Sequence, residues 1–187
     1  MRLQITGDPA ADAVLAENPF ALLAGMMLDQ QYPMEHAFRG PAKVLDRLGS
    51  FDPADVAAAD PEAFAALAAT TPAIHRFPGS MAARLQELAR VVLESYDGDA
   101  ARIWTEATDA GDLLKRVMAL PGFGRQKAQI FMALLAKQGG VQLEGWERAV
   151  GDYALEGYRS VADVVDAESL QKVREFKKQK KAAARSS

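Results

Sequence analysis

The sequence is poor in the residues that build covalent cross-links and metal sites. Its 187 residues include no cysteine, which excludes disulfides, a thiolate nucleophile, a cysteine-ligated zinc ion and an iron–sulfur cluster. The only two histidines, His36 and His75, lie far apart along the chain, which argues against a histidine-based metal site. We therefore expect no cofactor that depends on such ligands.

Long apolar stretches are also missing. No apolar run approaches the length of a membrane span, and residues 1–13 contain no apolar signal core. Hydrophobic residues make up 49% and charged residues 25% of the chain, which is enough to form a packed core. We expect a soluble cytoplasmic protein without a membrane partner, folded as one compact domain or as two small lobes around a shared cleft.

Patterns typical of β-strands are scarce. Apolar residues recur at helical spacing almost throughout, alanine is abundant, and alternating β-branched stretches are rare. The pattern predicts an all-α fold, in which Met1–Ile5 and Val141–Leu143 are the only strand candidates. Pro19–Gln30 has little polar surface, so we expect it to be the buried central helix.

Start and stop signals indicate the other helices. Asp52-Pro53 and Asp60-Pro61 each place an N-cap residue before a proline in the first turn. Ser80 is expected to cap a long helix over Met81–Tyr96, and a helical region over 33–48 should break at Gly40-Pro41. Further helices are expected at Asp8–Glu17, Ala100–Glu106, Ala110–Leu120, Trp146–Ala154 and from about Ala167 onward.

The most informative segment is the turn Leu120–Gly124, which separates two predicted helices. Pro121 stops the first helix, and Gly122 and Gly124 permit positive φ and a close approach of the backbone. Phe123 is expected to point inward and to lock the two helices together. The turn therefore predicts a tight hairpin of helices.

The second helix of this hairpin begins with unpaired backbone donors. The N–H groups of Gly124, Arg125 and Gln126 have no acceptor in the helix, and a helix N-terminus of this kind binds phosphate. Arg125 and Lys127 add positive charge. Such a turn would bind one strand of double-stranded DNA through its backbone, without reading the base sequence.

This arrangement resembles the helix-hairpin-helix of the HhH-GPD superfamily of base-excision DNA glycosylases. Asn18-Pro19-Phe20 followed by Leu28-Asp29-Gln30-Gln31 is similar to another helix of these enzymes, and Arg76–Ser80 with the following long helix is similar to the segment before their hairpin. Together these segments cover roughly residues 15 to 150. The same turn is also found in unrelated helical proteins as a simple helix end.

The resemblance implies a DNA-binding surface. In the family, the second glutamine of the first segment fills the gap left by an extruded nucleotide, and Gln31 is the matching position; a surface residue at a helix end is the alternative. The DNA-binding residues implied are Gln31, Gly122, Phe123, Gly124, Arg125, Gln126 and Lys127.

The chemistry departs from the family pattern. The family places an aspartate 23 residues after the hairpin proline, where it stabilises an oxocarbenium-like sugar and assists a water molecule; here that position is Glu144. Asp152 and Glu147 are weaker candidates, because they sit on the following helix. Glu144 as a surface turn residue is the alternative.

A second position separates this chain from the lyases of the family. Their nucleophilic lysine corresponds to Gln126, and Lys127 is turned by about 100° around the helix. The resemblance therefore implies a monofunctional glycosylase without lyase activity. Alkylated purines are the first substrate expected, because that branch lacks both the lysine and the iron–sulfur cluster.

Aromatic side chains are available for a base pocket. Tyr32 beside Gln31 and Trp146 beside Glu144 are the best placed, and His36 lies on the helical face of Tyr32. Each of the three could instead belong to the core. Backbone carbonyls around Leu120, Gly122 and Phe123 could also hold a monovalent cation, as in family members.

The charge is divided unevenly along the chain. From residue 171 onward seven basic residues face one acidic residue, giving +6, whereas the net charge of the whole chain is −3. We expect a DNA-glycosylase-like domain over 1–165 and a C-terminal helix with a basic tail over 166–187, which either contacts DNA or is simply solvated.

Three functions remain open. The first is a monomeric DNA glycosylase that acts near the nucleoid. The second is a non-catalytic protein of the same fold that binds DNA lesions, which the missing aspartate would explain. The third is an unrelated helical interaction protein whose hairpin is only a turn.

Overall fold

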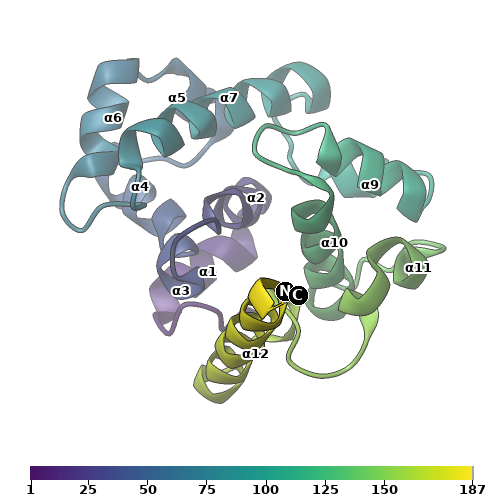
Figure 1. The fold of residues 1–187 in the computed structure, drawn as a ribbon. Helices are drawn as coiled ribbons and strands as arrows, with labels where there is room; N and C mark the ends of the chain where they lie inside the picture. The colour runs from purple at the N-terminus through teal and green to yellow at the C-terminus, as the bar shows by residue number, and fades with distance from the viewer. Residues whose placement is uncertain (187) are drawn as a thin grey trace.

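The computed structural model describes residues 1–186, and these residues form helices joined by short loops, with no strand among them (Figure 1). The all-α prediction is therefore confirmed. The first lobe contains α1 (Pro9–Glu17), α2 (Pro19–Leu28), α3 (Met34–Ala37), α4 (Gly40–Leu48), α5 (Pro53–Ala58), α6 (Pro61–Ala69) and α7 (Pro78–Tyr96). The second contains α8 (Arg102–Thr105), α9 (Ala110–Met118), α10 (Arg125–Gly139), α11 (Trp146–Val150), the 3₁₀ turns η1 (Gly151–Ala154) and η2 (Val161–Asp163), and α12 (Ala167–Ser186).

Helix α2 is the centre of the molecule, as its apolar composition predicted. Every residue from Phe20 to Leu28 is buried, and the helix contacts α1, α3, α4 and α7 in its own lobe and α10 in the other. Asn18 caps its start by accepting the N–H of Phe20 at 3.0 Å. The helix ends at Leu28 rather than Gln30, because Asp29 leaves the helical conformation with φ −75° and ψ 71°. The contact between α2 and α10 joins the two lobes.

Aspartate caps define the short helices of the first lobe. Asp8, Asp52 and Asp60 each accept a backbone N–H in the first turn of the helix that follows, and each helix begins with proline. The prediction for Ser80 is wrong. Helix α7 begins three residues earlier than expected, at Pro78, because proline suits the first turn, and Phe77 occupies the N-cap position without a side-chain hydrogen bond.

Three other expectations differ from the structure. Residues 1–5 form no strand; the N–H groups of Ile5 and Thr6 instead donate to the buried carboxylate of Asp12 at 3.1 and 2.9 Å. Residues 141–143 form a loop. The break before α4 falls at Phe38–Arg39 rather than Gly40-Pro41, because Pro41 is accommodated in the first turn of α4.

Among residues 1–186, no single helix is long and apolar enough to cross a membrane, and only the pair α1–α2, bent by 116°, meets that criterion by length and composition.

Candidate nucleic-acid interface

The hairpin lies between α9 and α10, as the sequence predicted. The turn closes through the N–H of Phe123, which donates to the carbonyl of Leu120 at 3.2 Å, and Gly122 adopts φ +84°. Phe123 is only 6% exposed, and its ring centroid lies 6.1 Å from that of Phe131 in α10. The prediction that Phe123 locks the helices is confirmed, and only its backbone can reach a ligand.

The start of α10 presents free backbone donors. The N–H groups of Arg125, Gln126 and Lys127 have no acceptor within residues 1–186, and no side chain caps the helix. Gly124, Arg125 and Gln126 are exposed. Gly124 has φ −87° and ψ −178°, so of the two glycines only Gly122 adopts the positive φ that both permit. The exposed donors and the helix dipole form a site for an anion such as phosphate.

The hairpin rests directly on the end of α2. A Cβ atom on Gly122 would lie 2.8 Å from Cγ of Met27 and 3.1 Å from Cδ of Arg84. The Nζ of Lys127 donates to the carbonyl of Met27 at 3.0 Å, so this side chain points toward α2. The structure therefore does not place Lys127 at the outer surface, where the sequence suggested a phosphate contact. Burial lowers the pKa of Lys127 to about 8, although the carboxylate of Asp29 opposes this shift.

Asp29 is a carboxylate that the sequence did not indicate as special. Its side chain is 9% exposed, and burial raises its pKa while Lys177 of α12, whose Nζ lies 3.7 Å away, and Lys127 lower it. No hydrogen bond to this carboxylate is shorter than 3.5 Å within the described chain, whereas the buried carboxylate of Asp12 accepts three. No sequence motif marks Asp29, which simply follows an apolar helix. Its burial beside the hairpin is therefore evident only from the fold.

Gln31 lies in the loop that follows α2. It is exposed and has φ +51°, a conformation that residues other than glycine rarely adopt. His75 fixes this loop, because its Nε2–H donates to the carbonyl of Gln30 at 2.8 Å while its Nδ1 accepts the N–H of Phe77 at 3.0 Å. The bond that Nδ1 accepts requires the neutral ring, and burial lowers the pKa of His75, which favours this neutral form. The Gln31 side chain is therefore presented on a rigid loop.

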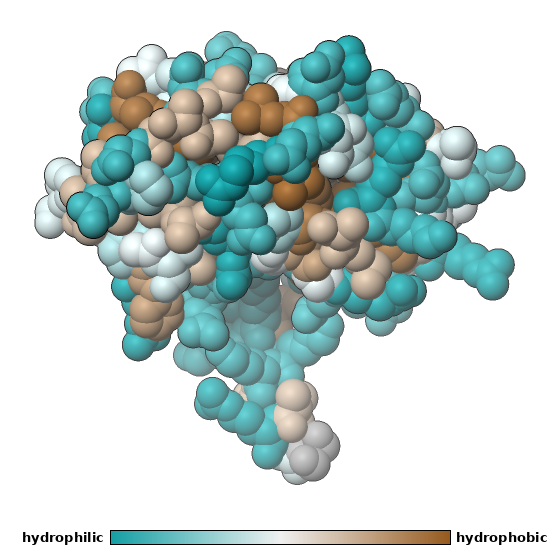
Figure 2. Space-filling view, turned by 90° about the horizontal axis from the view of Figure 1, so that it is seen from above, coloured by the Kyte–Doolittle hydropathy of each residue, from teal (hydrophilic) through white to brown (hydrophobic). Residues whose placement is uncertain are grey.

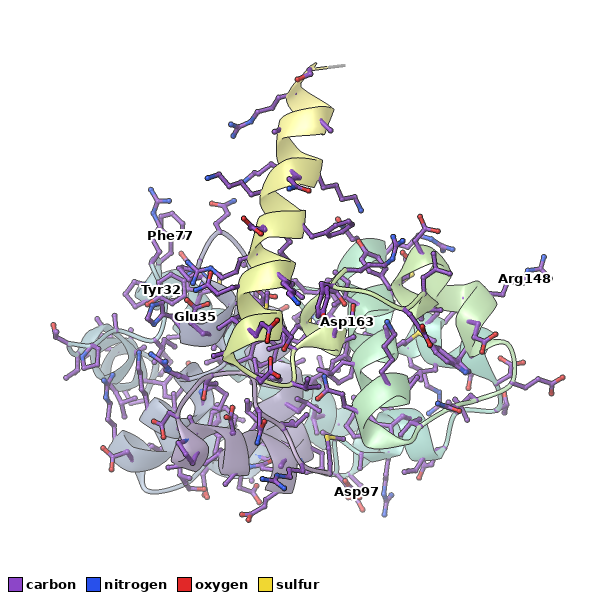
Figure 3. All side chains as sticks on the ribbon, turned by 90° about the horizontal axis from the view of Figure 1, so that it is seen from below. Tyr32, Glu35, Phe77, Asp97, Arg148 and Asp163 are labelled. Atoms are coloured by element: carbon purple, nitrogen blue, oxygen red, sulfur yellow. The ribbon has the colours of Figure 1, made fainter. Side chains whose placement is uncertain are left out.

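Aromatic rings gather next to Gln31. The ring centroid of Tyr32 lies 4.9 Å from that of His75 and 5.9 Å from that of His36, and the ring of Phe77 lies 6.0 Å from His75. Phe77 is 44% exposed. Figure 3 shows Tyr32 and Phe77 on the side of the molecule from which α12 projects. The structure brings Tyr32 and His36 together as expected, whereas Trp146 lies in α11 of the other lobe.

Glu144 lies far from the hairpin. It is exposed, and its backbone carbonyl accepts the N–H of Ala110 at 3.1 Å, at the end of α9 opposite to the hairpin. Helix α10, with 15 residues, is about 22 Å long and separates its hairpin end from the loop that contains Glu144. The structure therefore does not bring Glu144 to the anion site.

The chain turns back after Gly145 and returns to the hairpin. In α10 the Nε2 of Gln129 donates to the carbonyl of Ala149 at 3.0 Å, and the Nε2 of Gln126 donates to the hydroxyl of Tyr153 at 2.8 Å. Turn η1 thus lies beside the first turn of α10. Asp152, the weaker candidate from the sequence, is exposed and precedes Tyr153 in this turn.

Helix α12 contributes cations that the sequence did not assign to a site. Arg174 pairs with Glu35 of α3 at 3.0 Å, Lys177 pairs with Asp29, and the Nζ of Lys180 lies 5.5 Å from the ring centroid of Tyr153. Glu35 is buried, and its Oε2 atom has no hydrogen-bond partner within residues 1–186. The first part of α12 therefore spans from the Gln31 loop to η1.

No group of three or more histidine, aspartate or glutamate side chains in residues 1–186 is arranged to hold a metal ion. The monovalent cation at the carbonyls of Leu120 and Gly122 would use backbone oxygens instead. The Leu120 carbonyl accepts one N–H, from Phe123, and keeps a lone pair for such an ion. This cation site stays a prediction.

Comparison with known families agrees with this geometry. The family model described as "HhH-GPD superfamily base excision DNA repair protein" matches residues 24–186, which is most of the chain. No curated protein and no solved structure matches it. The chain belongs to the HhH-GPD superfamily of base excision DNA repair proteins, and the resemblance seen in the sequence is confirmed.

The two hairpin glycines should respond differently to alanine. We expect Gly122→Ala to lower the free energy of unfolding by about 1–3 kcal/mol, because its Cβ would meet Met27 at an unfavourable φ. Gly124→Ala should change it by less than about 0.5 kcal/mol, because nothing lies within 4 Å of its Cβ position. Urea unfolding measures both, and equal losses would contradict this account of the turn.

Lys127 should make stability depend on pH in the alkaline range. Its pKa is about 8 in the folded protein and 10.5 ordinarily, so the unfolded chain binds the proton more tightly. The free energy of unfolding of the wild type, relative to Lys127→Met, should therefore rise as the pH increases from about 8 to about 10. Urea titrations across this range test it; a difference that stays constant or falls would show that the ammonium is solvated.

Proposed function

We propose that this member of the HhH-GPD superfamily is a monofunctional DNA glycosylase, which extrudes a damaged base from double-stranded DNA and hydrolyses its N-glycosidic bond. The observation that carries the proposal is the set of exposed, unpaired N–H groups at the start of α10, beside the rigid loop that presents Gln31. The amides would bind a phosphate and Gln31 would fill the space of the extruded nucleotide. Superfamily membership supports DNA as the partner.

We assign the reacting carboxylate to Asp152 in preference to Glu144. Asp152 lies in η1 beside the first turn of α10, whereas Glu144 lies at the far end of that helix. In this mechanism the C1′–N bond breaks and its electron pair leaves with the base. The Asp152 carboxylate stabilises the oxocarbenium-like sugar, water adds its oxygen to C1′, and the water proton passes to Asp152 and then to solvent.

The absence of lyase activity belongs to the same proposal. Gln126, at the position of the family's nucleophilic lysine, has no amine and donates to Tyr153. The pKa of Lys127 is lowered, but its Nζ donates a hydrogen bond to the carbonyl of Met27 in α2. Neither side chain is placed to attack C1′ of a nucleotide held between the hairpin and Gln31.

The proposed substrates are alkylated purines. N-alkylation gives the base a positive charge while it is attached to the sugar, so it leaves as a neutral molecule without taking up a proton. Tyr32 and His36 offer aromatic faces, whose π-electrons attract a cation. These groups favour a cationic base over a neutral one.

A second candidate is a non-catalytic protein that recognises lesions with the same surface. It is favoured by Glu144, which stands where the family spacing leads one to expect aspartate. The proposal also includes a monomer that acts in the cytoplasm near the nucleoid.

The first experiment separates these candidates. Oligonucleotide duplexes carrying alkylated purines, uracil or oxidised bases are incubated with the protein, and release of free base is measured. We expect release from the alkylated purines and a loss of at least about 100-fold in single-turnover rate for Asp152→Asn, because the sugar cation loses its counter-charge.

Glu144→Gln is the matched control and should keep a rate near that of the wild type. Loss of activity in Glu144→Gln alone would return the catalytic role to that residue. Binding of the duplexes without release of any base would support the non-catalytic candidate.

The phosphate contact has its own signature. Arg125→Ala should weaken binding equally for all sequences and reduce the slope of log K against log salt by about 0.9, the value for one phosphate contact. Arg148→Ala, which removes an exposed arginine from α11, should leave the slope unchanged. Fluorescence anisotropy at several salt concentrations measures both, and a sequence-specific effect of Arg125→Ala would contradict the assignment.

A further inference from the structure

Helix α12 has an inner part, residues 167–176, that packs against the body, and an exposed outer part, residues 177–186, in which Lys177 and Lys180 still reach side chains of the body. Val173 is buried and Phe176 is half-buried, and they fix the inner part. Arg174 and Lys177 pair with Glu35 and Asp29 in the first lobe, while Lys180 approaches Tyr153 in the second. Helix α12 is thus held at the edge of the proposed DNA site from both sides.

The outer part leaves the body with a uniform charge. All residues from 177 to 186 are exposed, and after Glu175 the sequence contains five basic and no acidic residues: Lys177, Lys178, Lys180, Lys181 and Arg185. The side chains of Lys178, Lys181 and Arg185 form no ion pair or ring contact within the described chain. Figure 2 shows this part as a hydrophilic arm that projects from the molecule.

We infer that the outer part of α12 is a second DNA-binding element, which contacts the backbone of the same duplex that the hairpin binds. The inference rests on the proposed function for the identity of the partner. Residues 177–186 form about 15 Å of helix, and a duplex admits an α-helix in its major groove. The arm projects on the side where Tyr32 and Phe77 lie, as Figure 3 shows, so a duplex held there would meet it.

Two ion pairs fix the base of the arm against the body. Arg174 and Lys177 are one helical turn apart and face two buried carboxylates, Glu35 and Asp29, that have few other partners. A short helix without packing is marginal by itself in water, so an anionic surface along the outer part would stabilise it. The charge of the arm, with no apolar face beyond Phe176, selects a polyanion rather than a protein groove.

The test uses the full chain and an undamaged duplex, so it needs no turnover. The triple variant Lys178→Gln/Lys181→Gln/Arg185→Gln removes the three free cations of the arm. We expect weaker binding and a slope of log K against log salt that is less steep by about 2.7, or 0.9 for each lost phosphate contact. The matched control, Arg90→Gln/Lys115→Gln/Arg148→Gln, changes net charge equally at exposed sites on α7, α9 and α11 and should keep the wild-type slope.

Hydrogen exchange supplies a second readout that net charge alone would not change. The amides of residues 178–186 should exchange rapidly in the free protein and should be protected when the duplex is added. The inference would be overturned if the wild type and the arm variant had the same slope of log K against log salt, or if the control variant changed this slope equally. It would also be overturned if the duplex left the hydrogen exchange of these amides unaltered. Failure of the wild type to release any base would overturn the catalytic proposal alone, whereas failure to bind duplex would overturn both.

Discussion

The contact between the first turn of α10 and the last turn of α2 determines the arrangement of the functional surface. Gly122 has no side chain to hold it away from Met27, and Lys127 donates to the Met27 carbonyl. The hairpin is therefore fixed to Met27, which lies only four residues before Gln31. The hairpin and Gln31 are nevertheless about ninety residues apart in the chain. Because α2 is buried along its whole length, the hairpin and the Gln31 loop are held by the same rigid core.

Charged groups are buried in this core at a cost in free energy, as expected of a functional region. Asp29 and Lys127 are both removed from water, and burial shifts their pKa values toward the neutral forms. Glu35 keeps a buried oxygen without a hydrogen bond within the described residues. The structural carboxylate of Asp12, in contrast, accepts three hydrogen bonds. Buried polar and charged groups that lack a full set of partners, and that cluster beside a proposed DNA site, are typical of surfaces that bind a ligand.

The difference between Glu144 and Asp152 shows the limit of counting along a sequence. A fixed spacing from Pro121 does not by itself show beside which end of α10 a residue lies. Here α10 continues to Gly139, so the position reached by counting lies at its far end. The return toward the hairpin is made by α11 and η1, through contacts of Gln129 and Gln126 that involve single side chains and leave no periodic signal.

The sequence by itself determined the helical class, the aspartate caps, the central apolar helix and the hairpin with its exposed amides. These features depend on local rules, because caps, turns and helical periodicity act over a few neighbouring residues. The tertiary structure decided the inward direction of Lys127, the burial of Asp29 and Glu35, the return of η1 to the hairpin and the anchoring of α12 across both lobes. Each of these features depends on residues that are distant in the chain and come into contact only when α2 and α10 pack together. Local sequence patterns contain no information about such long-range contacts.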